Sequence, residues 1–353
     1  MSEFLPQHAA HCKNCRAGFY LPSHAGAPFC PNCFGARLEP IPAFAQDAAP
    51  ELVIPFTVNE TILAANLERW ARDIPFQHSS LNWNALRARV TRVYLPMYLA
   101  DARVWGTWRA QVGFDYLVAS SEERYQNAQW VTQRINETRI RWEPRAGDIS
   151  RAYENIAAPA LEQHTRELSA LATNGSAFDT SRAISFSPDA LANSLLRAPE
   201  LANDAAWKFA QVEVERRAAR DCQNAANAQH IEQFELRAAY GEPRWTLMLL
   251  PTFVTSYNDD DGKWIPVRVN GQTGAVSGAK RASMNSARRW TYLIGGIAFL
   301  AFLFALLVGL LTQVADAFTW LAALALVVTL LLALAAPLPL IIAWQYNWRQ
   351  AEK

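Results

Sequence analysis

The most strongly hydrophobic stretches of the chain lie near its C-terminus. Residues 290–312 (WTYLIGGIAFLAFLFALLVGLLT) and residues 318–344 (FTWLAALALVVTLLLALAAPLPLIIAW) contain no charged side chain. The first stretch would be roughly 34 Å long as a helix, which is enough to cross the hydrocarbon core of a bilayer. Helices of soluble proteins seldom stay apolar on every face over this length. The pattern therefore predicts a transmembrane hairpin over residues 286–348, followed by a short tail over 349–353.

Two segments of the preceding region have the periodicity of amphipathic helices. In residues 60–73 (ETILAANLERWARD) the apolar positions fall near one helical face: Ile62, Leu63, Leu67 and Trp70. Thr57 and Glu60 have the spacing of a capping box, which predicts that the helix begins there. Residues 202–229 are rich in Ala, Arg and Glu, and they predict a longer amphipathic helix.

Several other apolar segments of this region predict strands. Residues 89–116 are rich in Val, Tyr and Trp with partial alternation, which predicts two strands joined near Gly106. Pro96 within the first of them predicts an edge position or a bulge. Residues 137–159 predict another strand pair that turns near Gly147.

Three more strands are expected after the long helix. They lie over residues 230–240, 244–257 and 263–269, with chain reversals at NDDDG and NGQTG. Strands mixed with two prominent helices predict an α+β domain over residues 53–285.

Four of the five cysteines form two Cys-x-x-Cys pairs near the N-terminus. The pairs are Cys12 with Cys15 and Cys30 with Cys33. Fourteen residues lie between the two pairs. Two residues between thiolates let a tight knuckle point both sulfurs at one ion, and a hairpin between the knuckles completes a tetrahedron. Gly18 and Gly35 follow the pairs, where chain reversal favours glycine. The spacing predicts a zinc ribbon over residues 1–40 with one structural Zn(II), then a Pro- and Ala-rich linker over 41–52. Two disulfides, or an iron site of the rubredoxin type, are the alternatives.

The basic residues around the apolar stretches predict their orientation. Lys280, Arg281, Arg288 and Arg289 precede the first stretch, and Arg349 and Lys353 follow the second. The segment between them, residues 313–317, has one Asp and no Lys or Arg. The positive-inside rule therefore places both termini in the cytoplasm, as in a multi-pass protein of the inner (plasma) membrane. The four basic residues before the first stretch are expected to lie against anionic headgroups.

The predicted orientation also indicates the redox state of the cysteines. No hydrophobic segment opens the chain, so export of the N-terminus is not expected. Thiols stay reduced in the cytoplasm and remain available for metal, which favours zinc over disulfides.

Charge and motif content narrow the classes of function. The chain has 33 basic and 32 acidic residues, and 29 and 30 remain when residues 288–353 are left out. Because duplex-binding domains usually have a clear basic excess, nucleic-acid binding is not favoured. The sequence has no Gly-Lys-Ser/Thr phosphate loop, Gly-x-Ser-x-Gly elbow, His-Glu-x-x-His or Gly-x-Gly-x-x-Gly motif. We therefore expect a protein that is not an enzyme.

The NDDDG segment has some features of a calcium-binding loop. Asp259, Asp261 and Gly262 fall at suitable offsets, but Tyr257 takes the first ligand position and Arg268 stands where a bidentate Glu is needed. The segment is therefore predicted to be a hairpin turn.

Several segments together resemble a known family. They are VIPF with the helix that ends at Trp70, VYLPMYLADARV, TRIRWEPRAG, LLPTFVTSY and VRVNGQTGAVSG. In order and spacing they are similar to bacterial zinc-ribbon membrane proteins of unsettled function, which are often labelled primosomal protein N-prime or superfamily II helicase. This chain differs in having Tyr98 and Phe253 where relatives tend to have Trp after the Leu-Pro segments, and SGAKRAS lacks the usual proline. The helicase label does not fit a chain without a phosphate loop.

Two hypotheses of function follow. The first is a membrane-anchored zinc-ribbon adaptor or scaffold that acts by protein–protein interaction at the cytoplasmic face of the membrane. The resemblance implies partners among phage-shock or band-7-like membrane proteins and a role in membrane stress. The alternative is a nucleic-acid-binding protein tethered to the membrane, for which the ribbon offers only Lys13, Arg16 and Arg37 as cations.

Overall fold

A computed structural model describes residues 7–22, 28–42, 44, 49–126, 129–162, 178–191, 193–311 and 318–351. The fold mixes helices and strands, as the sequence predicts. The chain forms two compact units, each made of separate chain segments. Unit 1 comprises Met1–Leu95, Thr165–Ala198 and Leu249–Lys353, and unit 2 comprises Pro96–His164 and Pro199–Met248.

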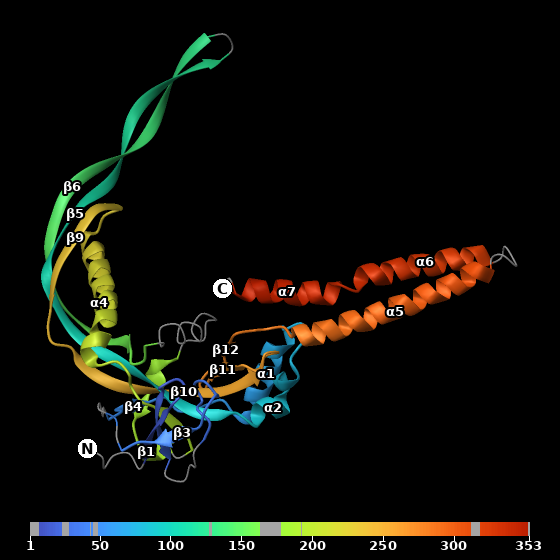
Figure 1. The fold of residues 1–353 in the computed structure, drawn as a ribbon. Helices are drawn as coiled ribbons and strands as arrows, with labels where there is room; N and C mark the ends of the chain where they lie inside the picture. Colours follow the sequence, from blue (N-terminus) through green and yellow to red (C-terminus); the bar gives the residue numbers. More distant parts are fainter. Residues whose placement is uncertain are drawn as a thin grey trace. The chain divides into compact units, whose positions relative to one another are not determined.

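Unit 1 is built on a mixed sheet with the strand order β12-β11-β10-β5-β8-β2-β1-β3. Among these strands, β1, β3, β10, β11 and β12 are labelled in Figure 1. The strands are β1 (Gln7–Cys12), β2 (Gly18–Pro22), β3 (Leu38–Pro40), the start of β5 (Thr91–Gln126), β8 (Leu195–Arg197), β10 (Arg244–Asn258), β11 (Trp264–Asn270) and β12 (Val276–Gly278). Two short strands, β4 (Leu52–Val53) and β7 (Ile184–Ser185), pair with each other, and β4 also pairs with β10. The turns between β10, β11 and β12 lie at the NDDDG and NGQTG segments, as predicted.

The cysteine-bearing strands β1–β3 belong to this sheet. β2 pairs with β8, with Phe19 opposite Arg197, and the Arg197 guanidinium donates to the Gly18 carbonyl (3.1 Å). Phe44 packs edge-on against Tyr20, with ring centroids 5.0 Å apart. This differs from the predicted ribbon of residues 1–40 joined by a linker to a separate domain, although part of that linker, residues 43 and 45–48, lies outside the described residues. The prediction missed the pairing because β8 is short and about 175 residues distant in sequence.

The first helix of unit 1, α1 (Glu60–Arg72), packs on the sheet near β10 and β11. It begins close to the predicted start, but its N-cap is Asn59, whose Oδ1 accepts from the Ile62 N–H (2.9 Å). The predicted capping box is therefore wrong, since Thr57 Oγ1 instead donates to the Gln272 carbonyl (2.6 Å). Unit 1 also contains α2 (Trp83–Arg87) and the 3-10 turns Ser79–Leu81, Thr180–Arg182 and Pro188–Leu191. A buried cluster around Leu67, Tyr257 and Val267 holds α1 to β10 and β11.

The described part of unit 2 holds a long antiparallel hairpin, one long helix, one further strand and the start of β10. β5 (Thr91–Gln126) pairs with β6 (Gln129–Pro159) along nearly its whole length, and β9 (His230–Tyr240) pairs with the other edge of β5. The predicted turns near Gly106 and Gly147 are therefore wrong, since each glycine lies inside one continuous strand.

Both glycines are required by close packing rather than by a turn. A Cβ at Gly106 would lie 2.1 Å from the Arg237 carbonyl oxygen in β9, and a Cβ at Gly147 would lie 2.9–3.0 Å from the Trp108 indole. Pro96 lies where β5 changes partner, because pairing with β8 ends at Tyr94 and pairing with β6 begins at Met97. A residue without an N–H is tolerated at such a break in the ladder.

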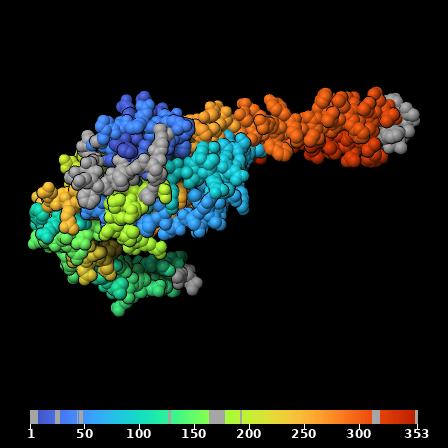
Figure 2. All heavy atoms as spheres, turned by 90° about the horizontal axis from the view of Figure 1, so that it is seen from below, coloured from blue at the N-terminus to red at the C-terminus, as the bar shows by residue number. Residues whose placement is uncertain are grey.

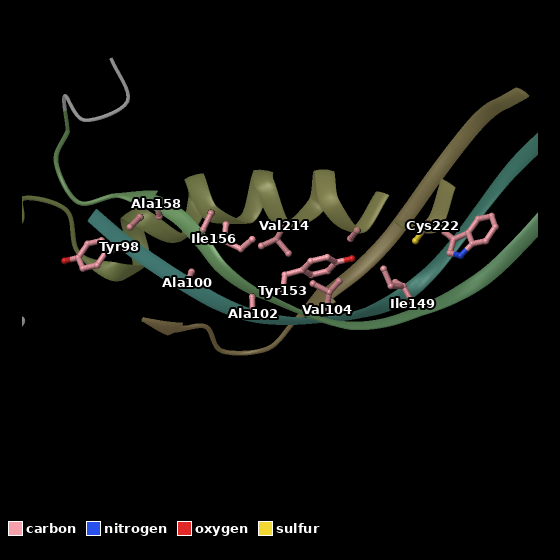
Figure 3. Close-up of a cluster of buried hydrophobic side chains, with 14 of the residues drawn as sticks. Tyr98, Ala100, Ala102, Val104, Ile149, Tyr153, Ile156, Ala158, Val214 and Cys222 are labelled. Carbon is pink, nitrogen blue, oxygen red and sulfur yellow. The ribbon is translucent and has the colours of Figure 1, made fainter. Parts of the chain in front are cut away.

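The core of unit 2 lies between the helix α4 (Asn203–Ala226) and the strands β5 and β6 (Figure 3). Every fourth residue of α4 is buried and small: Ala206, Ala210, Val214, Ala218, Cys222 and Ala226. Because these side chains are small, the helix can lie close to the sheet. They pack against Val104, Ile149 and Ile156 of the strands. The long helix and β9 confirm the prediction for this region.

The hairpin of β5 and β6 continues beyond the end of β9 as a two-stranded ribbon (Figure 1). We call this part, residues 115–126 and 129–140, the arm. Its large apolar side chains are exposed, among them Leu117, Tyr125 and Trp130, which are 70%, 62% and 70% exposed. Two strands alone bury little apolar surface, so the arm lacks a core of its own.

The C-terminal apolar segments form the helices α5 (Met284–Leu311), α6 (Phe318–Ala335) and α7 (Leu338–Ala351). α5 and α6 pack against each other, as the orange and red spheres in Figure 2 show. α6 and α7 together form a second apolar segment, Thr319–Gln350, interrupted at Pro337. Both segments are long and apolar enough to cross a membrane. The connecting residues 313–317 and the tail residues 352–353 lie outside the described residues.

Candidate metal centre

The two Cys-x-x-Cys knuckles close with the same pair of backbone hydrogen bonds. In the first, Cys12 N–H donates to Ala17 O (3.0 Å) and Arg16 N–H to Cys12 O (2.8 Å); in the second, Cys30 N–H donates to Ala36 O and Phe34 N–H to Cys30 O (both 2.8 Å). The residue after each second cysteine is left-handed, with φ of 60° at Arg16 and 55° at Phe34. The glycines expected to reverse the chain serve another purpose, since a Cβ at Gly35 would lie 2.8 Å from Asn14 Nδ2 and one at Gly18 would strike Phe44.

The knuckles bring the four predicted ligands together. All four Sγ atoms, of Cys12, Cys15, Cys30 and Cys33, lie within 4.8 Å of one another. The distances across the cluster, Cys12 to Cys33 and Cys15 to Cys30, are both 3.6 Å. A tetrahedron of sulfurs ~2.3 Å from a central ion has edges of about 3.8 Å. Disulfides need S–S contacts of about 2.05 Å, so the arrangement fits a shared metal ion and the four residues are free cysteines.

Two asparagines support the sulfurs in a symmetric way. Asn14 Nδ2 of the first knuckle donates to Cys33 Sγ (3.5 Å), and Asn32 Nδ2 of the second donates to Cys15 Sγ (3.6 Å). Each amide therefore reaches across to the opposite knuckle. Hydrogen bonds of this kind orient ligands and stabilise the thiolate form. Neither asparagine was predicted, although the sequence carries a signal for both, the repeated Asn before the second cysteine in CKNC and CPNC.

Burial and hydrogen bonds act in opposite directions on the thiols. Burial raises the pKa of Cys30, and it also raises the pKa of Cys15. At Cys33 burial raises the pKa too, but hydrogen bonds from the Gly35 backbone and the Asn14 amide, with those from neighbouring thiols, outweigh it and bring the pKa to about 7. A bound cation would favour the thiolate at all of these positions.

The cysteine cluster is held against the body of unit 1. Arg268 in β11 donates to Asn32 Oδ1 (3.2 Å), so a chain of two hydrogen bonds leads from β11 to Cys15. The ring of Phe34 lies 6.5 Å from that of Trp264, also in β11. Orientation of the second knuckle therefore depends on β11, more than 200 residues later in the chain.

The basic residues predicted to lie on the membrane surface have two different environments. Lys280 Nζ contacts Asp73 Oδ2 (2.8 Å) and lies over the Trp70 ring, and Arg281 contacts Asp259 (3.5 Å). These two residues serve contacts within unit 1. Arg288 and Arg289 are exposed in the first turns of α5 and remain available to headgroups.

The start of α5 is fixed by polar residues that the sequence analysis did not identify. Asp260 Oδ1 accepts from Ser283 Oγ (2.7 Å), and its Oδ2 accepts from the Asn285 N–H (3.0 Å) at the first turn of the helix. Asn347 of α7 makes two bonds to the Ala282 backbone, 2.8 Å to the N–H and 3.0 Å to the carbonyl. The NDDDG turn that we predicted is thus present, and its second Asp caps a helix, which is favourable at the positive end of the helix dipole.

A buried histidine adjoins this contact. His78 is 7% exposed, and its Nδ1 lies 3.5 Å from Asp260 Oδ1. Burial lowers the pKa of His78, whereas the carboxylates of Asp260 and Asp259 act in the opposite direction. A cavity of about 270 Å³ opens here, lined by His78, Asp259, Asp260, Asp261, Arg281, Arg288 and Asn347 among others.

No protein-family model, curated protein or solved structure matches this chain.

Proposed function

We propose that this protein is a membrane-anchored adaptor that faces the cytoplasm and acts by protein–protein interaction. The observation that carries the proposal is the exposure of the two apolar segments. Only 17% of the most apolar part of α5 and 6% of that of the second segment is buried. A core hairpin of a soluble protein would bury most of this surface, whereas a lipid-facing hairpin exposes it to hydrocarbon.

Features around the helices support the same orientation. Arg288 and Arg289 at the start of α5 and Arg349 near the end of α7 are basic, and residues 313–317 hold no basic residue. Trp290 and Tyr292 at the start of α5, with Trp344 and Trp348 in α7, are exposed in the manner of an interfacial aromatic belt. Both ends of the hairpin, and with them the body of unit 1, would lie on the cytoplasmic side of an inner (plasma) membrane.

The metal of this adaptor is a single structural Zn(II). Zinc prefers four tetrahedral thiolates, and the reducing side of the membrane keeps these thiols available. Cys12, Cys15, Cys30 and Cys33 would fill its coordination shell, which leaves no open position for water or substrate. The ion therefore supplies stability and rigidity to the cysteine-bearing strands rather than catalysis.

Thiol labelling in intact cells tests the orientation. Asp316→Cys places a thiol between the two apolar segments, and Ser80→Cys places one in the body of unit 1. A membrane-impermeant maleimide should label Asp316→Cys from outside, and should label Ser80→Cys only after lysis. Labelling of Ser80→Cys from outside would contradict the proposal, as would release of the full chain from membranes by carbonate at high pH.

The partners are proposed from the resemblance described above. They are membrane-stress scaffolds of the phage-shock or band-7 kind. Capture of the tagged full chain from detergent-solubilised membranes should enrich such scaffolds over a matched control, another two-span protein with the same tag. Enrichment of ribosomes or replication proteins would instead favour the nucleic-acid alternative. On that alternative, Lys13 is already paired with Glu39 (2.7 Å), which reduces the charge offered to phosphates.

A further inference from the structure

In the arm of unit 2, the edge of β5 beyond the end of β9 is open within the described part of the chain. β9 pairs with β5 only as far as Gly113, and the Gln229 side chain accepts the next backbone N–H, that of Asp115 (2.6 Å). From Tyr116 to Gln126 no strand in the described part of the chain pairs with this edge of β5. Unpaired N–H and C=O groups of this kind are a template for another strand.

Along the arm, the outer edge of β6 carries three charged side chains, Arg134, Glu137 and Arg139, and Arg139 is paired with Glu137 (3.2 Å). Pro144, which has no N–H to donate, lies in β6 just outside the arm. Proline and repeated charge are the means by which natural sheets protect an edge. The open stretch of β5 has no proline or glycine, and its one arginine, Arg124, is paired with Glu122 (3.2 Å).

We propose that the arm is a self-association element, in which the β5 edges of two copies of this chain pair antiparallel about a two-fold axis. The result is a four-stranded sheet in the order β6-β5-β5-β6. Two strands are marginal in water, whereas three or more that share an apolar face can be stable. This inference does not depend on the membrane anchor or on the proposed adaptor role.

The length of the open edge sets the register. Full overlap of the stretch Tyr116–Gln126 in two antiparallel copies places Ser121 opposite Ser121 of the second copy. Leu117 then lies opposite Tyr125 of the second copy, on the face that also carries Trp130. Ring centroids of Tyr125 and Trp130 are 5.3 Å apart within one hairpin, so each copy offers an aromatic pair to the Leu117 of the other.

Charges are compatible with this register. Arg124 lies opposite Val118 of the second copy and diagonal to its Tyr116 ring, within reach of a cation–π contact. Glu123 lies opposite Ala119. No two like charges lie directly opposite each other. A slip by one residue would turn the apolar residues of one copy to the opposite face, so this register is the one that buries them.

Disulfide cross-linking of the full chain in its native membranes tests the inference. Ser121→Cys should form a covalent dimer on mild oxidation, because its two thiols meet at the two-fold axis. The control Thr132→Cys lies on the same face of the arm but on β6. We expect roughly tenfold more dimer from Ser121→Cys than from Thr132→Cys, because only the former meets the distance limits of a disulfide. The wild-type chain serves as the background, since its one cysteine outside the metal cluster, Cys222, is buried.

A second pair of substitutions tests the apolar contact. Leu117→Asp in the Ser121→Cys background should abolish the dimer, since the carboxylate would face the Tyr125 ring of the second copy. Thr138→Asp adds the same charge directly across the hairpin from Leu117 and should leave the dimer intact. The inference is overturned if Ser121→Cys stays monomeric while its thiol reacts fully with a soluble maleimide, if it cross-links to a different protein, or if Thr132→Cys cross-links equally well.

Discussion

At the scale of single residues, the asparagines of the two knuckles link the metal ligands to the rest of unit 1. Asn32 accepts from Arg268 through its oxygen and donates to Cys15 through its nitrogen, so both ends of one amide are used. A ligand held in this way keeps its orientation when no ion is bound. Loss of such supporting hydrogen bonds in other metal sites weakens binding without removing a ligand.

We expect Asn32→Ala to weaken zinc binding roughly tenfold or more, because Cys15 loses its donor and the link to β11. The measurement is a competition titration of the purified full chain against a chromogenic chelator. Lys13→Ala is the matched control, since Lys13 lies in the other knuckle and its charge is paired with the exposed Glu39. Equal affinities for the two variants would show that the asparagine does not support the site.

His78 gives a second prediction at this scale. Its pKa is lowered in the folded protein, chiefly by burial. The folded state therefore binds a proton less readily than the unfolded state does, and stability should fall as the pH drops below the ordinary histidine pKa of about 6.5. His78→Gln, which keeps a donor near Asp260, should flatten this part of the pH dependence.

Thermal melting of the full chain in detergent between pH 8 and pH 5.5 makes the comparison. Acid also protonates the metal ligands, but both chains share that loss, so the difference between wild type and His78→Gln isolates the histidine. Parallel melting curves across the whole pH range would contradict the assignment.

At the scale of elements, the helix α4 depends on small residues at every fourth position. Ala218 is fully buried against the sheet, and a larger side chain there must push the helix away. We expect Ala218→Leu to destabilise unit 2 by about 1–3 kcal/mol. Ala225→Leu, at an exposed position of the same helix, should change stability little. Hydrogen exchange of the α4, β5 and β6 amides would measure both, and equal protection in the two variants would contradict the packing argument.

Sequence patterns predicted the elements whose signals are local. The helix α4, the strands β9 to β11 and their turns have clear periodicity or turn residues, and they lie close to the predicted positions. The long hairpin was divided wrongly because Gly106 and Gly147 have the residue type of a turn. Their role is set by a carbonyl in β9 and an indole in β5, and neither neighbour can be read from local sequence.

The candidate metal site was likewise predicted only where the sequence signal is local. The spacing of Cys12, Cys15, Cys30 and Cys33 was sufficient to predict that they meet, because a knuckle is a local structure. Arg268 and Trp264 could not be linked to the site from sequence, since only the tertiary fold brings β11 to the second knuckle. The helix cap at Asp260 was missed for a similar reason, because the acceptor and the helix it caps are separated by more than 20 residues.

At the scale of the molecule, the metal cluster and the sheet of unit 1 are one structure. β2 pairs with β8, and the second knuckle contacts β11. Removal of the ion should therefore loosen β8 and β11 as well as the cysteine-bearing strands. Unit 2, which has its own core, should be unaffected.

Hydrogen exchange of the full chain before and after chelation measures this effect. We expect lower protection in β2, β8 and β11, with α4 as the internal control. Restored protection on addition of Zn(II) would exclude damage by the chelator. If only residues 7–40 lose protection, the cysteine-bearing strands form a separate module, as the sequence first indicated.

Unit 1 is made of chain segments that lie far apart in the sequence, and this affects how it assembles during synthesis. β2 leaves the ribosome about 175 residues before β8 does, which corresponds to roughly 9–35 s of translation. Through this interval the edge of β2 that pairs with β8 has no neighbour, although β1, β3 and all four cysteines emerge near its start. An ion captured early would hold the nascent strands in their final pairing until the later segments arrive, so zinc supply during translation should influence the yield of correctly assembled chains.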